Sequence, residues 1–141
     1  MMACVVDASV AVKWFLAGAG DEDHVPQALQ LLLGLREGRI ALIQPPHWKA
    51  EIAAVLARRL PDTAATHLQD LLLIEGIAFI DIPHVYRDAV ELATRLRHHL
   101  FDTLYHATAF HADATLITAD RRYHDKAAPL GQIMLLEQWP G

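Results

Sequence analysis

Short apolar runs alternate with longer stretches of helical periodicity along this chain. Five runs are rich in aliphatic or β-branched residues and are bounded by acids or turn residues, which predicts five strands. We place them at residues 4–6, 41–44, 77–81, 115–118 and 132–136. Strands that alternate with helices predict an α/β fold with a mostly parallel sheet and helices on both faces.

The stretches between the strands carry apolar residues three and four positions apart, as one face of a helix does. One helix is expected to start at Ala8, and another to run from Phe101 to about Ala112. The expected buried faces of four other helices are Leu29, Leu32 and Leu33; Trp48, Ile52, Val55 and Leu56; Leu68, Leu71 and Leu72; and Val85, Ala89, Leu92 and Leu96. A further short helix is expected after Asp120.

The length and composition agree with this class. A chain of 141 residues is expected to form a single domain, here residues 1–141, and 53% hydrophobic residues suit strands that are covered on both faces. Charged residues or prolines interrupt every apolar run before it could cross a bilayer. Asp7 comes too early for a signal peptide, and Cys4 has no partner for a disulfide. We therefore expect a soluble cytoplasmic protein with no membrane partner.

Two of the predicted strands end in the same way. Asp7 directly follows the strand at residues 4–6, and Asp120 follows the strand at residues 115–118. The carboxyl ends of parallel strands open on one edge of a sheet, where α/β proteins keep their ligand crevice. Each acid also has a simpler interpretation as the N-cap of the helix that follows it.

Two further acids lie near the starts of predicted helices. Glu51 lies in the helix at residues 47–56, and Asp102 begins the helix that runs to Ala112. Both have apolar neighbours in the sequence, which a solvent-facing acid does not need. The alternatives are that Asp102 is only a favourable charge at a helix N-terminus and that Glu51 is only a border residue.

A cluster of these acids would need a cation. Two unit charges about 4 Å apart repel by roughly 4 kcal/mol at an effective dielectric of 20. Carboxylates suit Mg²⁺ or Mn²⁺ rather than Zn²⁺, and such an ion can activate water and polarise a phosphodiester. The net charge of −5 argues against a broad, sequence-independent grip on nucleic acid, but it agrees with a carboxylate-lined metal site.

Four motifs resemble those of the PIN-domain family, and more narrowly the VapC toxins of toxin–antitoxin pairs. They are DASVAVKWF from residue 7, P-x-W-x-x-E from residue 46, FDTLYHA from residue 101 and LITADRRY from residue 116. The resemblance implies a three-layer α/β/α sandwich and a Mg²⁺- or Mn²⁺-dependent endoribonuclease. It also implies inhibition by a VapB-like antitoxin and assembly as a homodimer.

The resemblance also assigns roles to residues. Asp7, Glu51, Asp102 and Asp120 match the acidic quartet that is both catalytic and metal-binding, while Ser9 and Thr118 match hydroxyl positions that support it. The chain departs from the pattern at Ala54, where relatives have Asn, and at His106, where they have an aliphatic residue. The first departure removes a supporting hydrogen bond, and the second points to either altered substrate contacts or a structural histidine.

Basic residues near the acids are candidate RNA contacts, because cations position phosphates. They are Lys13, Arg121 and Arg122, and the alternative for either arginine is a solvated helix end. Two other functions stay open: a catalytically inactive PIN-like module that binds RNA or antitoxin, and an unrelated α/β phosphohydrolase. The dipeptide His124-Asp125 resembles that of HD phosphohydrolases, with His98 and His99 as further ligands, but that fold is all-helical.

Overall fold

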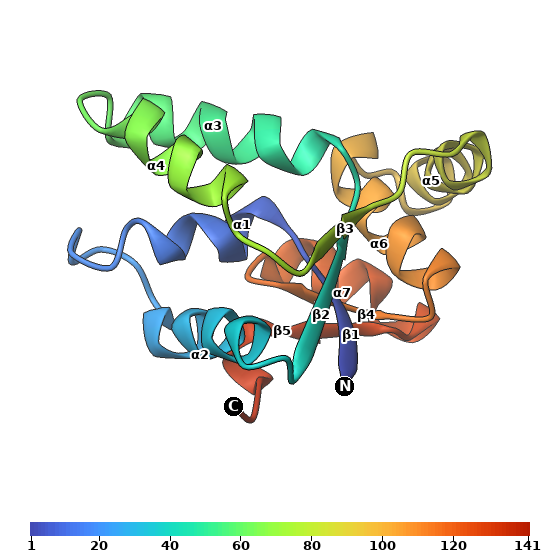
Figure 1. Cartoon of the computed structure of the whole chain (residues 1–141). Helices are drawn as coiled ribbons and strands as arrows, with labels where there is room; N and C mark the ends of the chain where they lie inside the picture. The colour runs from blue at the N-terminus through green and yellow to red at the C-terminus, as the bar shows by residue number, and fades with distance from the viewer.

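The computed structural model describes residues 1–141 and contains one five-stranded sheet (Figure 1). Every pair of neighbouring strands is parallel, and their order is β3-β2-β1-β4-β5. The strands are β1 (Met2–Val6), β2 (Ile40–Gln44), β3 (Ile77–Phe79), β4 (Thr115–Thr118) and β5 (Ile133–Leu135). The predicted α/β fold with a parallel sheet is confirmed, and the two outer strands are shorter than the sequence pattern suggested.

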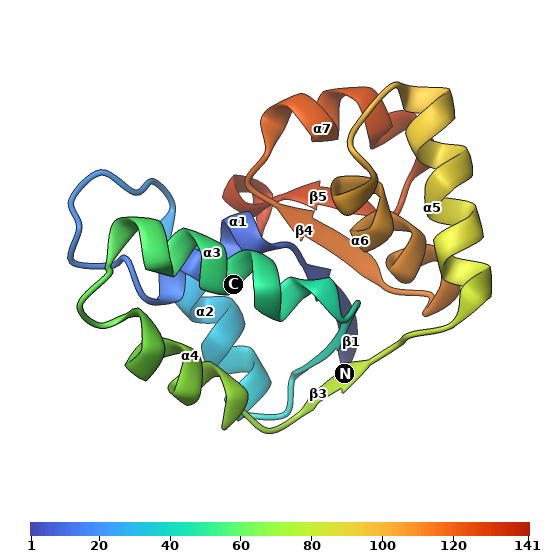
Figure 2. The ribbon, with the colours of Figure 1, turned by 90° about the horizontal axis from the view of Figure 1, so that it is seen from above.

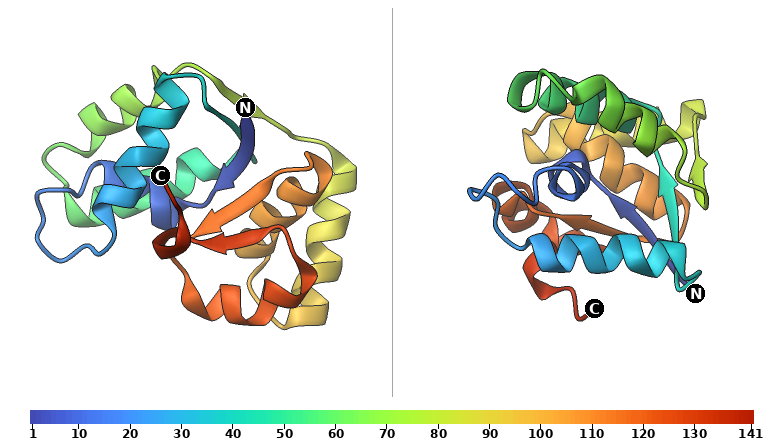
Figure 3. Two further views of the ribbon diagram at one scale, coloured as in Figure 1. Left: turned by 90° about the horizontal axis from the view of Figure 1, so that it is seen from below. Right: turned by 60° about the vertical axis from the view of Figure 1, so that its left-hand side comes forward.

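Seven α-helices connect and cover the strands. They are α1 (Ala8–Ala11), α2 (Val25–Arg36), α3 (His47–Arg59), α4 (Ala64–Leu72), α5 (Pro83–Leu96), α6 (Leu100–His111) and α7 (Arg121–Ala127). Helix α2 packs against β2, and α6 packs against β1, β2 and β4 from the opposite side of the sheet (Figure 3). None of these helices is both long enough and apolar enough to span a membrane.

Helix α2 buries a different face from the one predicted. Leu29 and Leu33 are exposed, and the buried positions are Ala28, Leu31, Gly34 and Leu35. The reason is a close approach to β2, because a Cβ on Gly34 would lie 2.7 Å from the Cδ1 atom of Ile40. A small residue therefore decides the contact face here. In contrast, α3 buries Trp48, Ile52 and Leu56 as the sequence pattern predicted, and the fourth predicted residue, Val55, is half-buried.

The strand order places the carboxyl ends of β1 and β4 side by side. The chain leaves β1 toward β2 on one side and leaves β4 toward β5 on the other, which is the arrangement that opens a crevice in α/β sheets. Val6 is in register with Ile117, so the residues that follow these two strands are neighbours. Seen from above, α3 lies on one side of the start of α1, and α5 and α6 lie on the other (Figure 2).

The side chain of Gln44 holds the last residue of β1 in place. Its Nε2 donates to the Val6 carbonyl at 2.7 Å, and its Oε1 accepts from the Val6 N–H at 2.9 Å. Gln44 is completely buried, and the residue after Val6 is Asp7. At Val6, hydrogen bonds from a buried side-chain amide thus take the place of backbone hydrogen bonds between β1 and β2, directly before the crevice.

We expect Gln44→Ala to lower the free energy of unfolding by about 2–4 kcal/mol, because it leaves two buried backbone groups unpaired and a cavity beside them. Urea unfolding measures this loss. As a control, Gln27→Ala removes a partly exposed glutamine from the first turn of α2. A Gln44→Ala protein as stable as the control would contradict this role.

Candidate active site

Four acids from four separate segments line one pocket of about 210 Å³. Asp7 follows β1, Glu51 lies in α3, Asp102 lies in the first turn of α6, and Asp120 follows β4. The remaining lining comes from Ala8, Ser9, Val12, Val55 and Tyr105. The acids that the sequence singled out therefore share one hollow at the carboxyl ends of β1 and β4.

Asp7 is the most buried of the four acids, with 8% of its surface exposed. Its Oδ1 accepts from the Ser9 hydroxyl and from the Val10 N–H, while its Oδ2 accepts from the Thr118 hydroxyl. Burial raises the pKa of Asp7 to about 7, although these three hydrogen bonds lower it, and the charge of Asp102 raises it further. The Asp7 carboxylate is thus costly at neutral pH unless a cation compensates it.

The two hydroxyl groups also connect Asp7 to the loop after β4. The Ser9 hydroxyl oxygen accepts from the Ala119 N–H at 3.1 Å, and the Thr118 hydroxyl oxygen accepts from the Asp120 N–H at 2.9 Å. Each hydroxyl donates its own proton to Asp7. These bonds fix the position of Asp7 relative to Asp120.

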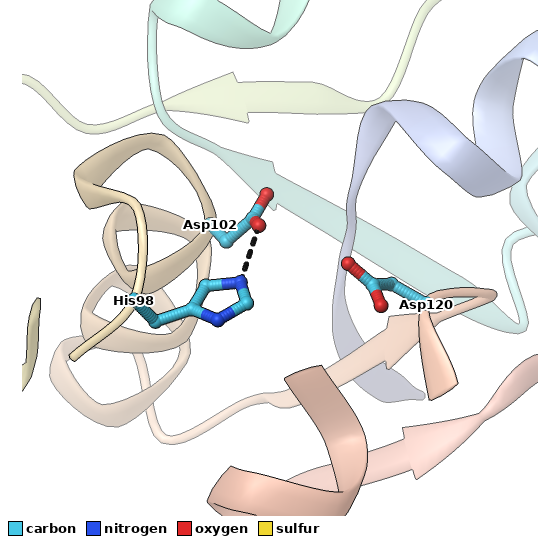
Figure 4. Close-up of side chains that lie close together, drawn as sticks. All are labelled: His98, Asp102 and Asp120. Atoms are coloured by element: carbon cyan, nitrogen blue, oxygen red, sulfur yellow. Dashed lines mark hydrogen bonds and ion pairs between the residues drawn. The ribbon is translucent and has the colours of Figure 1, made fainter. Parts of the chain in front are cut away.

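Asp102, Asp120 and His98 form the tightest group of possible metal ligands (Figure 4). One ligand atom from each lies within 4.8 Å of the others. The Nε2 of His98 lies 2.7 Å from the Oδ2 of Asp102, and the carboxylate of Asp120 faces them from the end of β4. On the other side of the ring, the Lys126 ammonium lies 3.2 Å from Nδ1. Because an ammonium group only donates, the His98 proton belongs on Nε2 and points to Asp102.

Glu51 approaches the pocket from α3 and accepts a hydrogen bond from Tyr105, while His47, whose Nε2 also lies 3.0 Å from the Phe101 carbonyl, lies beside it. The Tyr105 hydroxyl donates to the Oε1 of Glu51 at 2.9 Å, and the Nε2 of His47 lies 3.0 Å from the same oxygen. Burial raises the pKa of Tyr105, and the charges of Glu51 and Asp7 add to this effect, so the phenol stays a proton donor. The second oxygen of Glu51 has no protein partner.

The simpler interpretation of two acids as helix caps is also correct. The Oδ1 of Asp7 accepts from Val10 N–H at the start of α1, and the Oδ1 of Asp120 accepts from Tyr123 N–H at the start of α7. A cap uses only part of a carboxylate, and both residues still line the pocket. Capping and a place in the pocket are therefore compatible in the same residue.

The two departures from the family motif have different surroundings. Ala54 is exposed and does not line the pocket. His106 is completely buried, with Nδ1 at 2.9 Å from the Tyr123 hydroxyl and Nε2 at 2.9 Å from the Gly131 carbonyl. Burial lowers the pKa of His106. Of its two interpretations, the structural one is correct, since a ring without exposed surface makes no substrate contact.

The three basic residues proposed as RNA contacts differ in whether an acid already pairs with them. Lys13 is 7% exposed and is paired with Glu22 at 3.0 Å, and Arg121 is paired with Glu137. Arg122 is exposed and has no acid within 4.0 Å, so its charge is uncompensated. Of the three, only Arg122 can bind an anion without breaking an ion pair.

Sequence reasoning missed Tyr105 as a member of the site and considered His98 only as a ligand in the HD-phosphohydrolase alternative. Their spacing from Asp102 carried a signal, because His98 is four residues before it and Tyr105 three residues after it. On a single helix these positions would share a face. His98 lies outside α6, however, so its approach to Asp102 depends on the turn between α5 and α6.

The donor set suits a hard divalent cation. Its four carboxylates offer oxygen atoms, which Mg²⁺ and Mn²⁺ prefer as ligands. Hydrogen bonds to Asp7, Glu51 and Asp102 orient those carboxylates, as ligands in metal sites are usually oriented. A larger hollow of about 670 Å³ between α2 and α4 contains none of the four acids.

Comparisons with known proteins agree with the α/β fold. Residues 4–129 match the family model described as the PIN domain. VapC20 of Mycobacterium tuberculosis, described as a toxin that cleaves the sarcin–ricin loop, is 19% identical, with a TM-score of 0.66 over 89% of this chain and 94% of that one. VapBC2 of Rickettsia felis, solved with a promoter DNA fragment, is 18% identical, with a TM-score of 0.62 over 95% and 97%. No curated protein sequence matches this chain.

Proposed function

This chain belongs to the PIN-domain family, and we propose that it is a metal-dependent endoribonuclease of the VapC toxin type. One observation carries the proposal: four carboxylates from distant parts of the sequence share one pocket at the carboxyl ends of β1 and β4. Crowded acids of this kind are unfavourable unless protons or cations compensate them. The description of VapC20 as a cleaving toxin supports the same reaction class here.

We assign the metal ligands to Asp7, Glu51, Asp102 and Asp120. A bound Mg²⁺ or Mn²⁺ supplies Lewis-acid chemistry, which makes water a better nucleophile and stabilises charge on a phosphodiester. The protein contributes orientation. Ser9 and Thr118 fix Asp7, Tyr105 fixes Glu51, and His98 fixes Asp102.

The proposal is tested by incubating the purified protein with structured RNAs in Mg²⁺ or in EDTA. We expect internal cuts in Mg²⁺, or in Mn²⁺, and none in EDTA. RNA binding without cleavage in either metal would favour a catalytically inactive module. Hydrolysis of small phosphate esters without RNA cleavage would favour an unrelated phosphohydrolase. Either result would contradict the assignment as a ribonuclease.

The proposal includes partners. Among the similar structures are a toxin–antitoxin complex of Klebsiella pneumoniae, with a TM-score of 0.64, and VapBC-1 of nontypeable Haemophilus influenzae, also with 0.64. On this basis we propose that a VapB-like antitoxin inhibits this protein. We also propose a homodimer, which rests on the motif resemblance to VapC toxins alone. RNA is the proposed substrate.

His98 provides a test of the metal site that does not depend on cleavage. We expect His98→Ala to weaken Mn²⁺ binding about tenfold, because residues that orient a ligating carboxylate usually contribute this much. Isothermal titration calorimetry measures the affinity. His99→Ala is the matched control, since His99 is an exposed neighbour that makes no hydrogen bond to the acids. Equal Mn²⁺ affinity in the two variants would contradict the role of His98.

A further inference from the structure

A second hollow lies beside the acid pocket and has the opposite charge. It measures about 280 Å³ and is lined by Ala93, Arg97, His98, His99, Arg122 and Lys126. We call it the basic hollow. Its lining contains three permanent cations and no acid.

The cations of the basic hollow differ from the other uncompensated cations of this chain because three of them line one small hollow. Elsewhere Lys13, Arg39, Arg59, Arg87 and Arg121 each have a carboxylate oxygen within 4.0 Å. Arg97, Arg122 and Lys126 have none. The other unpaired cations, Arg36, Lys49, Arg58 and Arg95, do not line this hollow. In a protein with a net charge of −5, three uncompensated cations around one small hollow leave a local positive charge.

The last turn of α5, the turn between α5 and α6, and both ends of α7 build the hollow. Arg97 ends α5 in the left-handed conformation, with φ of 51°, and its carbonyl accepts from the Lys126 ammonium at 3.1 Å. The same ammonium lies 3.2 Å from His98 Nδ1. Lys126 is thus held in place by neutral acceptors, which leave its full charge.

The basic hollow and the acid pocket are adjacent. His98 lines the hollow and also contacts Asp102, and Arg122 lies two residues after Asp120. Figure 4 shows the His98 ring between the turn that follows α5 and the acids. A ligand that reaches both sites needs an anionic group next to the group held at the acids. A nucleic-acid strand has this form, because its phosphates repeat along the backbone.

We propose that the basic hollow binds a backbone phosphate of the RNA strand, next to the phosphate that lies at the acid pocket. This rests on the proposed ribonuclease function and adds a binding site to it. Phosphate contacts of this kind fix the register of a strand and carry no sequence information. The hollow therefore positions the substrate, while the acids hold the metal.

The test compares two charge-matched double variants. Arg97→Gln/Arg122→Gln removes two exposed cations of the hollow that make no side-chain hydrogen bond, and Arg36→Gln/Arg58→Gln removes two exposed cations at the ends of α2 and α3. Fluorescence anisotropy with a labelled single-stranded RNA, in EDTA and over a range of NaCl concentrations, gives the affinity and its salt dependence. EDTA keeps the RNA uncut.

Loss of one phosphate contact is expected to reduce the slope of log K against log salt by about 0.7. If the affinity at 1 M salt is unchanged, this lowers the affinity for RNA at 0.1 M salt by about fivefold. The control variant is expected to keep the wild-type slope. An unchanged slope in Arg97→Gln/Arg122→Gln, or an equal loss in the control, would overturn the proposal. The proposal would also be overturned if the Arg97→Gln/Arg122→Gln variant bound RNA normally but bound an acidic protein partner more weakly than the wild-type protein does.

A separate cleavage assay in Mg²⁺ distinguishes this inference from the proposed function. If the wild-type protein cuts no RNA but the slope changes as expected, the basic hollow stands as an RNA site and the ribonuclease proposal fails. If RNA is cut and the slope is unchanged, the ribonuclease stands and the hollow has no role in binding. In an active enzyme, the Arg97→Gln/Arg122→Gln variant should raise KM and leave kcat near the wild-type value.

Discussion

Asp7→Asn is expected to reduce RNA cleavage at least about a hundredfold and to stabilise the metal-free protein. The loss of activity follows because Asn removes one of the four proposed charged ligands, and even residues that only orient a ligand contribute tenfold or more. The gain in stability follows because a buried carboxylate that lies near Asp102 is replaced by a neutral group of the same shape.

The gain in stability depends on pH in a way that identifies its cause. The pKa of Asp7 is about 7 in the native protein, against an ordinary value of 3.8, so the native state binds this proton more tightly than the unfolded chain does. The wild-type protein is therefore destabilised as the pH rises from 3.8 through 7. Above that range the free energy of unfolding of Asp7→Asn exceeds that of the wild-type protein by at most about 4 kcal/mol. At about pH 4 this difference in free energy falls to near zero.

Urea unfolding in EDTA at several pH values measures this difference, and a cleavage assay in Mg²⁺ measures the activity. Asp62→Asn is the control, since Asp62 is an exposed acid in the turn after α3 and lines no pocket near the site. It should leave both quantities unchanged. Full cleavage activity in Asp7→Asn would contradict the metal-site argument, and a pH-independent difference in stability would contradict the assignment of the pKa.

Mn²⁺ or Mg²⁺ is expected to stabilise the wild-type protein, and EDTA should reverse this effect. A ligand that binds only the native state at a hundred times its Kd adds about 2.7 kcal/mol to the free energy of unfolding. The effect should be larger at about pH 8 than at about pH 6, because the ion competes with the proton on Asp7. Thermal unfolding with and without Mn²⁺ gives the shift in Tm.

The acid variants provide the control for this stabilisation. Asp102→Asn and Asp120→Asn should each lose most of the Mn²⁺ effect, while Asp62→Asn keeps it. An equal shift in Tm in all variants would place the ion elsewhere on the protein. No shift in the wild-type protein would show that the pocket does not take a divalent ion under these conditions.

The sequence predicts the sheet and two of the acids because these follow from local pattern. Buried parallel strands appear as short apolar runs, and Asp7 and Asp120 come directly after two of them. The rule that carboxyl ends of parallel strands share an edge then places both residues together. Glu51 and Asp102 are harder, because the start of a helix does not by itself indicate where the helix lies. Their positions near helix starts and their apolar neighbours suggested a place beside the other two, and the family motifs assigned them a shared role.

The features that the sequence does not predict depend on contacts between distant elements. The face that α2 buries is set by the small residue Gly34 against Ile40. His98 reaches Asp102 only because Arg97 ends α5 in a left-handed turn, and the position of Lys126 depends on that same turn. Gln44 is an ordinary strand residue in the sequence and a backbone tether in the structure. No local periodicity carries this information.

The most direct measurement is a crystal structure of the protein grown with Mn²⁺, with anomalous scattering used to locate the ion. We expect one or more anomalous peaks inside the pocket, with carboxylate oxygens of Asp7, Asp102 and Asp120 at distances typical of coordination, and with Glu51 bound directly or through water. Peaks confined to other surfaces, or an empty pocket at saturating Mn²⁺, would contradict the claim that these four acids form a metal site.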